Sequence, residues 1–260
     1  MITNKIYLHA DDYGRSLNIN KSIENLIKIN KINSISVIVN LNKKNLNKKF
    51  NKKINLKLHL NLTDGLEKNI GLFSLFLHNF YESKTKTALK DNIKSQLTDF
   101  KKIYNKKTIY LDGHEHVHLI PWIFNFIIKN SHKYNIKKIR VINEKFIINN
   151  FKDLLNINFL RNLIKFLILR FFSHIAIKKL KNKKIKYDNF CGQLYSNMLN
   201  RKIIKKMIEK NLNKKKLEVL FHPGYSLKKE KKFFNEKYYN YFYNKKRNKE
   251  FQLLKSLNLK

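Results

Sequence analysis

The amino-acid sequence predicts an α/β fold, and within that class a (β/α) barrel more than an open doubly wound sheet. Apolar runs alternate with helix-like segments along the chain, which is typical of a mostly parallel sheet. No glycine-rich phosphate loop follows the first predicted strand, so a nucleotide-binding sheet loses support. Aspartates and histidines fall near the carboxyl ends of several predicted strands, which is where the active site of a (β/α) barrel gathers.

The length and composition favour one large domain, which we expect to span 1–260. The chain has 260 residues, of which 43% are hydrophobic, and this is enough for a sizeable core. The single cysteine, Cys191, excludes an internal disulfide and fits a reducing compartment. The first residues, MITNKIYLHADD, lack the long apolar run of a signal peptide. We therefore expect a cytoplasmic protein.

The chain is strongly basic, with a formal net charge of +38 from 56 Lys and Arg against 18 Asp and Glu. Such an excess is typical of proteins that bind polyanions. However, Lys, Asn and Ile crowd the whole sequence, as in KKNLNKKFNKK, and AT-rich codons encode these residues. Compositional bias therefore explains the charge better than a selected binding site, and we expect no dedicated nucleic-acid partner.

The first half of the chain reads as strand, helix, strand and strand. Ser16 is suited to cap the first helix, whose apolar residues follow a helical spacing. The third strand alternates strictly, with leucines on one face and Lys57 and His59 on the other. The predicted ranges are a strand at 5–10, a helix at 17–30, and strands at 35–40 and 54–62.

The second half continues the alternation. Pro121 suits the first turn of a helix, and the region 145–184 is helical and rich in lysine. The predicted ranges are a helix at 86–104, a strand running into a loop at 108–119, a helix at 121–134, a strand at 136–143, a strand and loop at 186–196, a helix at 200–213, and a strand and turn at 217–225.

The most lipid-like stretch, FLRNLIKFLILRFFSHIAIKK at 159–179, is not a membrane-spanning segment. Arg161, Lys165, Arg170 and His174 interrupt it, so no run of about twenty apolar residues exists. We expect no transmembrane segment in the chain. The stretch predicts a helix that covers the core, and the alternative is a basic helix on a membrane surface or against an anionic substrate.

The stretch DGHEHVH at 112–118 is the first candidate site. Asp112, His114, His116 and His118 would share a face if the chain stayed extended, because side chains alternate along a strand. Imidazoles and carboxylates are usual ligands of Zn²⁺ and similar cations. A lone histidine is more often a hydrogen-bonded core residue, but three within five residues favour a metal site. His114 is the preferred ligand, and His116 is the alternative or a residue that orients a ligand.

The stretches LHADDYG at 8–14 and LHLNLTDG at 58–65 supply two further candidates. Asp11 and Asp12 end a strand and diverge, so one carboxylate can bind a metal while the other faces the substrate as a general base. A nearby cation would lower the cost of ionising both. The alternative is that one aspartate only caps the following helix. His59 lies on the polar face of its strand and becomes a third ligand if these strand ends meet.

The stretch FHPGY at 221–225 completes the set. Pro223 and Gly224 enforce a turn directly after His222. This turn would hold His222 at a strand end, where it could act as a general acid that protonates a leaving group. The alternative is a buried histidine that bonds a carbonyl.

These four motifs, in this order and spacing, resemble the signatures of the YdjC-like carbohydrate deacetylases, a family that includes the chitooligosaccharide deacetylases. The resemblance runs from about residue 5 to 225, and DNFCGQLYS also looks like a loop of that family. The resemblance implies an irregular (β/α) barrel related to the polysaccharide deacetylases. The Lys-rich region 145–184 departs from the family in composition, and we expect the choice of substrate to depend partly on this variable region.

The resemblance also implies a reaction and a set of site residues. Members remove acetyl groups from N-acetylated sugars with one divalent ion, so the expected substrate is a free or lipid-linked sugar. Asp12, His59 and His114 match the metal positions, Asp11 matches the catalytic base, and His222 matches an acid or a substrate contact. Two imidazoles favour Zn²⁺, whereas a carboxylate and water suit Mg²⁺ or Mn²⁺. A homodimer is suggested by the family alone.

Two rival functions follow from the same sequence. A metallo-phosphoesterase or amidohydrolase also uses His-x-His motifs, but these typically lie near the first strand, whereas here the first strand carries two aspartates. A basic polyanion-binding protein would explain the charge but not the placement of the histidines and aspartates. We therefore expect a carbohydrate N-deacetylase with a metal-activated water.

Overall fold

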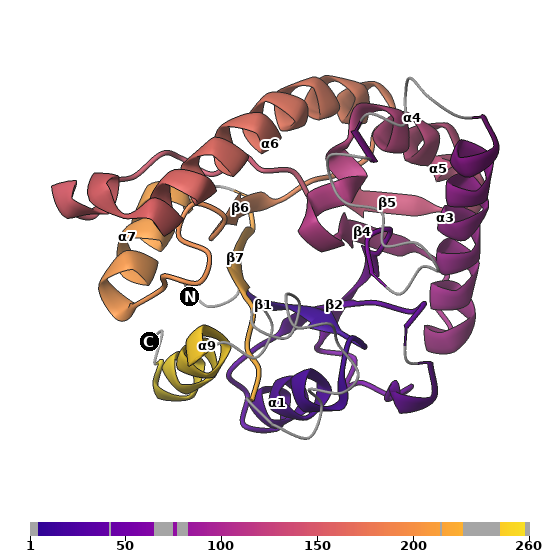
Figure 1. The fold of residues 1–260 in the computed structure, drawn as a ribbon. Helices are drawn as coiled ribbons and strands as arrows, with labels where there is room; N and C mark the ends of the chain where they lie inside the picture. Colours follow the sequence, from indigo (N-terminus) through magenta and orange to yellow (C-terminus); the bar gives the residue numbers. More distant parts are fainter. Residues whose placement is uncertain are drawn as a thin grey trace.

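The computed structural model describes residues 5–41, 43–64, 75–76, 83–213, 215–225 and 245–257. Its centre is a sheet of seven parallel strands in the order β5-β4-β3-β2-β1-β7-β6. The strands curl around a common centre with helices outside them (Figure 1). Their bounds are β1 Ile6–Tyr13, β2 Ser34–Val37, β3 Asn55–Leu60, β4 Ile109–Gly113, β5 Ile136–Ile139, β6 Asn189–Cys191 and β7 Leu217–Phe221.

The two edges of this sheet meet through the residues that precede β6. The backbone N–H of Ile139 donates to the carbonyl of Lys186 over 3.0 Å, and the N–H of Lys186 donates to the carbonyl of Lys137 over 2.9 Å. This is a single isolated bridge and not a full strand pair. The predicted α/β class and the irregular barrel are therefore confirmed.

The outer layer consists of helices that follow the strands. α6 is the longest of them among the described residues and crosses the outside of the barrel opposite α1 (Figure 1). The helices are α1 Leu17–Lys28, α3 Ser83–Tyr104, α4 Pro121–Lys129, α5 Ser131–Tyr134, α6 Ile157–Asn182, α7 Arg201–Asn211 and α9 Lys245–Ser256. Three 3₁₀ segments are η2 Lys43–Asn45, η3 His114–Leu119 and η4 Phe151–Leu155.

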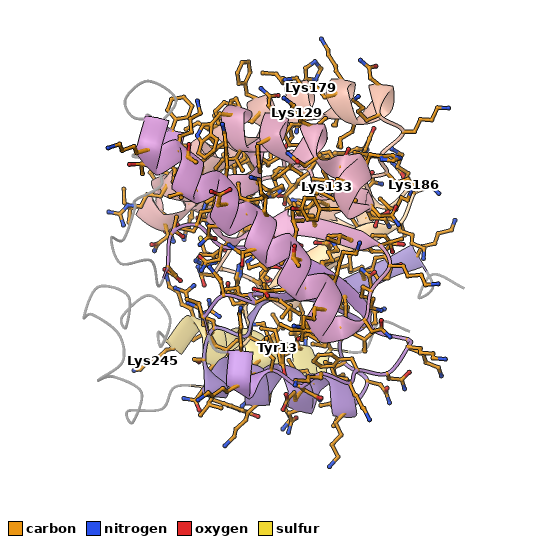
Figure 2. The ribbon with its side chains drawn as sticks, turned by 90° about the vertical axis from the view of Figure 1, so that its right-hand side faces the viewer. Tyr13, Lys129, Lys133, Lys179, Lys186 and Lys245 are labelled. Atoms are coloured by element: carbon orange, nitrogen blue, oxygen red, sulfur yellow. The ribbon has the colours of Figure 1, made fainter. Side chains whose placement is uncertain are left out.

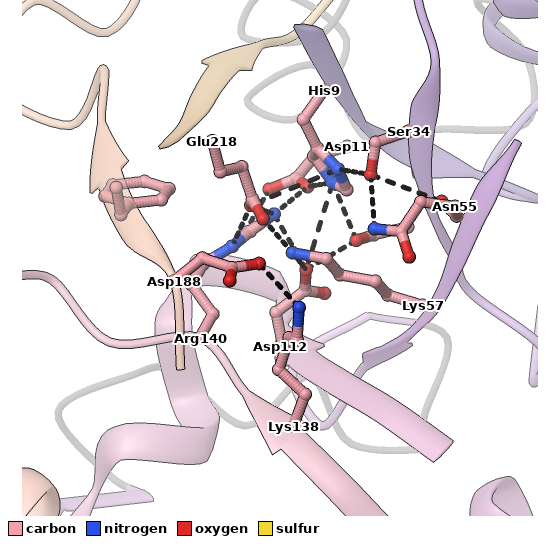
Figure 3. Close-up of polar contacts among 12 residues, drawn as sticks. His9, Asp11, Ser34, Asn55, Lys57, Asp112, Lys138, Arg140, Asp188 and Glu218 are labelled. Atoms are coloured by element: carbon pink, nitrogen blue, oxygen red, sulfur yellow. Dashed lines mark hydrogen bonds and ion pairs between the residues drawn. The ribbon is translucent and has the colours of Figure 1, made fainter. Parts of the chain in front are cut away.

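The period-two alternation of the strands separates an apolar outer face from a polar inner face. In β3, Leu58 and Leu60 belong to the apolar core, while Lys57 and His59 are equally buried. Polar side chains from several strands point toward one another inside the barrel (Figure 3). The alternation in the sequence therefore predicted the two faces correctly, but the polar face is enclosed by the barrel and not exposed to solvent.

Several predicted boundaries differ from the structure. Within 108–119, predicted as a strand running into a loop, the strand ends at Gly113 and the loop is the 3₁₀ segment η3, in which Glu115 and His116 have positive φ angles of 51° and 62°. The predicted helix at 121–134 divides at Asn130 into α4 and α5. Residues 145–150 are not helical, and α6 begins after Asn156, whose side chain accepts the N–H of Asn158 over 2.9 Å. The sequence reading did not predict α9.

Basic side chains cover much of the surface. The labelled Lys129, Lys133 and Lys186 extend outward and are exposed, whereas Tyr13 lies inside (Figure 2). None of the described helices combines the length and the apolar character that crossing a membrane requires.

Candidate active site

The carboxyl ends of β1, β3 and β4 bring together three residues from distant parts of the chain. Asp12 Oδ1 lies 3.0 Å from His114 Nδ1 and 3.5 Å from His59 Nε2. One ligand atom from each residue lies within 4.8 Å of the others, and each residue is buried. A carboxylate and two imidazoles at this separation fit a single divalent cation.

The two adjacent aspartates of β1 point in different directions. Asp12 has a positive φ of 72° next to an irregularity in the pairing of β1 with β2, and its side chain turns toward His114. Asp11 instead receives two hydrogen bonds from Arg140, from Nη1 to Oδ2 and from Nη2 to Oδ1, each 2.8 Å long. The divergence that the DD pair predicted is therefore present. In addition, the Arg247 guanidinium contacts Asp12 Oδ2.

His59 is held by Asp112 from the neighbouring strand. His59 Nδ1 lies 2.7 Å from Asp112 Oδ1, and β3 pairs with β4 so that these two residues are register partners. Asp112 also accepts a hydrogen bond of 2.5 Å from the Ser36 hydroxyl. The contact between Asp112 and His59 Nδ1 leaves His59 Nε2 facing Asp12. A carboxylate orients a metal-binding imidazole in this way.

The histidines of η3 have separate partners. His114 faces Asp12 through Nδ1, and Arg15 lies 2.9 Å from its Nε2. His116 Nε2 instead contacts Gln193 Oε1 over 2.7 Å, and His118 Nε2 donates to the Arg140 carbonyl over 3.0 Å. The expectation that Asp112 and these histidines share one face is wrong, because the chain turns after Gly113. His114 is the η3 histidine that lies beside Asp12 and His59.

The electrostatics of this cluster favour positive charge. Burial opposes protonation of His59, but Asp11 and hydrogen bonds to Asp112 and Asp12 outweigh it and raise the pKa of His59 to about 10. Burial would raise the pKa of Asp12, yet Arg247 and His114 hold it well below its ordinary value. His59 therefore faces a net negative potential, and the ionised Asp12 completes a donor set that fits a cation.

A second group of possible ligands, formed by His9, Asp11 and Asp112, lies deeper in the barrel. Its negative charge is already compensated by Arg140, whose Nη2 lies 2.8 Å from Asp11 Oδ1, 2.7 Å from Asp112 Oδ2 and 2.6 Å from Glu218 Oε1. Figure 3 shows this guanidinium among the carboxylates. Because a cation already occupies the centre of this group, the Asp12–His59–His114 cluster is the better candidate for a metal.

The Asp12–His59–His114 cluster opens into a cavity of about 420 Å³. Asp11 and the half-buried His222 also line this cavity, so the structure brings all five predicted site residues to one place. The backbone N–H of His222 donates to Glu250 of α9 over 2.6 Å. Burial lowers the pKa of His222 to about 4, so its imidazole is neutral near pH 7. Four basic side chains also line the cavity: Arg161, Lys165, Lys246 and Arg247.

The sequence reading missed the arginines that surround these carboxylates. Glu218 interrupts the apolar strand β7, and a charge in such a strand could have indicated a polar barrel interior. Arg140 directly follows β5, whose two lysines give no comparable contrast. Arg15 pairs with Asp64, which belongs to the LHLNLTDG motif, while Gly65 of that motif lies outside the described residues. Arg247 lies in a Lys-rich segment that gives no comparable signal.

Comparison with known proteins identifies relatives of the whole chain. The family model described as YdjC-like protein matches residues 5–260. A crystal structure from Enterococcus faecalis V583, of a protein provisionally named for cellobiose-phosphate cleavage, superposes with a TM-score of 0.58. The two share 14% sequence identity, and the match covers 96% of this chain and 90% of the other. No curated protein matches the chain.

Proposed function

Because the chain belongs to the YdjC-like protein family, we propose that it is a metal-dependent carbohydrate deacetylase. The proposed reaction removes the acetyl group from an N-acetylated sugar and releases acetate and a free amine. The carbohydrate class is supported by the family and by the provisional name of the Enterococcus faecalis protein, which refers to a phosphorylated sugar.

The observation that carries this proposal is the convergence of Asp12, His59 and His114 within 4.8 Å at a cavity that Asp11 and His222 also line. These residues would hold one divalent cation, either Zn²⁺ or Mg²⁺. When bound there, the cation supplies Lewis acidity that polarises water and carbonyl oxygens.

The side chains of this cavity account for the proton transfers. Asp11 is ionised, because Arg140 outweighs burial and holds the pKa of its carboxyl well below the ordinary value. The ionised carboxylate is the form that can take a proton from the attacking water, and this is the role that we assign to Asp11. His222 lines the same cavity and is the group that we assign to deliver a proton to the departing amine. Because its imidazole is neutral near pH 7, it must first receive that proton from within the site.

The basic lining of the cavity suits a substrate that carries negative charge. Arg161, Lys165 and Lys246 come from two helices, α6 and α9, that border the same cavity. Positive side chains lining a pocket attract an anionic group before any direct contact forms.

The proposal is tested by metal analysis of the purified protein, followed by an acetate-release screen over N-acetylated sugars. We expect about one divalent ion per chain, bound by the Asp12–His59–His114 cluster. We also expect acetate release that chelation abolishes and the restored metal recovers. Phosphate release from sugar phosphates, without acetate release, would instead support a metallo-phosphoesterase. Metal-independent acetate release would contradict the assignment of the cluster.

A further inference from the structure

The long helix α6 has apolar side chains on both sides, yet the described part of the chain covers only one of them. Its inner side chains are buried in the core, among them Phe159, Phe166 and Leu180. An apolar face of a helix normally packs against another surface. The outer side of α6 nevertheless faces away from the barrel (Figure 1).

The uncovered side forms one continuous stripe. Its members recur every three or four residues, so they project from the same face of the helix. Ile164 is 61% exposed and Phe171 is 63% exposed. The stripe is about 28 Å long at the rise of an α-helix. We call it the α6 apolar face, and its residues are Ile157, Leu160, Ile164, Leu167, Ile168, Phe171 and Ile175.

The apolar surface continues into η4, directly before α6. Phe151 is 83% exposed and Leu155 is 86% exposed, which are extreme values for large apolar side chains. Most of the exposed large apolar side chains among the described residues lie between 146 and 175. A concentration of this kind marks an interaction surface, whereas scattered exposed residues do not.

The charges around this face indicate which partner fits it. α6 contains no Asp or Glu, and Arg161, Lys178 and Lys181 are exposed along its length. Two copies of a chain with a net charge of +38 repel each other, and neither α6 could supply an acidic partner for the other. An apolar stripe bordered by basic residues instead matches the surface of an anionic lipid bilayer.

We propose that the α6 apolar face docks on an anionic membrane surface. The same helix borders the catalytic cavity, because Asn158, Arg161 and Lys165 line it. Arg161 therefore lies between the apolar face and the cavity, and a docked α6 places the cavity beside the lipid headgroups. Resting on the proposed function, this position suits an N-acetylated sugar displayed at the membrane surface.

The test compares two matched variants of the full chain. Ile164→Glu changes the α6 apolar face, and Ile29→Glu changes an exposed isoleucine at the end of α1, on the opposite side of the barrel. Both substitutions change the net charge equally, so the general attraction of a basic protein to anionic lipid is the same in both. Binding is measured by co-sedimentation with phosphatidylcholine vesicles that contain or lack phosphatidylglycerol.

We expect wild type and Ile29→Glu to bind the anionic vesicles alike, and Ile164→Glu to bind about tenfold more weakly. Equal binding by the two variants would overturn the proposal. So would a dimer in light scattering that Ile164→Glu converts to a monomer, because a second copy would then cover the face. Circular dichroism confirms that both variants are folded.

An activity measurement separates this proposal from the proposed function. Ile164→Glu should release acetate from a soluble N-acetylated sugar at the wild-type rate, but more slowly from a synthetic glycolipid with an N-acetylglucosamine headgroup in anionic vesicles. Equal rates on the glycolipid would contradict the docking proposal. Absence of acetate release from every substrate would contradict the proposed function, while the vesicle measurement would still decide whether the face docks.

Discussion

At the scale of single residues, the site depends on how two neighbouring carboxylates are kept apart. Asp11 turns into the barrel and meets Arg140, while Asp12 turns toward His114. Each carboxylate has its own arginine, since Arg247 contacts the second oxygen of Asp12. The arginines lower the cost of holding two ionised groups side by side in a buried place.

The role of Asp11 gives a first prediction. Asp11→Asn removes the proton acceptor but keeps the size of the side chain, so we expect kcat to fall about 10²- to 10⁴-fold while the bound metal stays near the wild-type amount. Asp91→Asn makes the same change at an exposed position beside Lys94 and should leave kcat unchanged. Measurement of kcat and metal content on the same samples tests whether Asp11 acts as the base without binding the metal. Wild-type activity of Asp11→Asn would remove Asp11 as the base.

His59 gives a second prediction, with metal content as the readout. His59→Ala removes one of the three converging ligand atoms, and we expect the purified variant to lose most of its metal. His132→Ala removes an exposed histidine of α5, and this variant should keep its metal. His116→Ala should also retain its metal, because His116 contacts Gln193 instead of the cluster. An unchanged metal content in His59→Ala would exclude His59 from the ligands.

At the scale of the elements, short turns after the strands place the functional groups. The turn after β6 illustrates this, because the Glu144 carboxylate accepts the N–H groups of Gly192 and Gln193, each over 3.0 Å. Gln193 then reaches His116 of η3. The turn therefore links two loops that border the cavity.

Gly192 gives a prediction at this scale. Its φ is +118°, and a Cβ atom there would lie 2.9 Å from Leu220 Cβ and 3.0 Å from the Leu220 carbonyl oxygen. We expect Gly192→Ala to lower the free energy of unfolding by about 2–4 kcal/mol, from a disfavoured backbone angle and overpacking. Gly224→Ala should lower the free energy of unfolding by less, because the new Cβ would meet the flexible side chain of Arg247 at 3.3 Å. Urea unfolding compares the two, and equal costs would contradict this reasoning.

At the scale of the whole molecule, the barrel differs from one filled with branched apolar side chains. Its interior holds a network of His9, Lys57, Arg140 and Glu218 with the aspartates (Figure 3). Burial lowers the pKa of His9 to about 3 and that of Lys57 to about 7. A buried network of this kind is sensitive to the loss of any one member, because the remaining charges stay out of reach of water.

Global stability should carry a pH dependence from the buried histidines. Burial lowers the pKa of His118 to about 4 from 6.5, so the unfolded chain binds a proton between these values that the folded protein does not. His118 therefore destabilises the fold as the pH falls from about 6.5 to 4. His118→Gln can still donate to the Arg140 carbonyl but does not titrate.

The measurement is the free energy of unfolding as a function of pH. We expect the slope for wild type to exceed the slope for His118→Gln by up to about 1.4 kcal/mol per pH unit in this window. Burial raises the pKa of Glu144 and of Glu250 to about 7. Both glutamates therefore raise the free energy of unfolding as the pH falls, which is opposite to the effect of His118. They are present in both proteins, so their effect cancels in the comparison. Identical slopes would show that His118 is not buried in its neutral form.

Local sequence signals predicted the class of fold and the convergence of the site residues, because both depend on where strands end. Asp12 and His59 lie at or near the carboxyl ends of predicted strands, and parallel strands bring these ends to one side of the barrel. The path of η3 was not predictable in the same way, since it depends on the left-handed backbone of Glu115 and His116. Arg247 pairs with Asp12 across 235 positions of chain, and no local pattern predicts such a pair.

The position of α9 has a consequence for the order in which this protein is made. Ribosomes make β1 before α9, yet Arg247 of α9 contacts Asp12 of β1, and Glu250 accepts the N–H of His222. Until α9 is made, the nascent barrel therefore carries Asp12 without its contact to Arg247. A stalled or prematurely terminated chain that lacks residues 245–257 would contain the same site residues but would lack the contacts that α9 makes with Asp12 and His222.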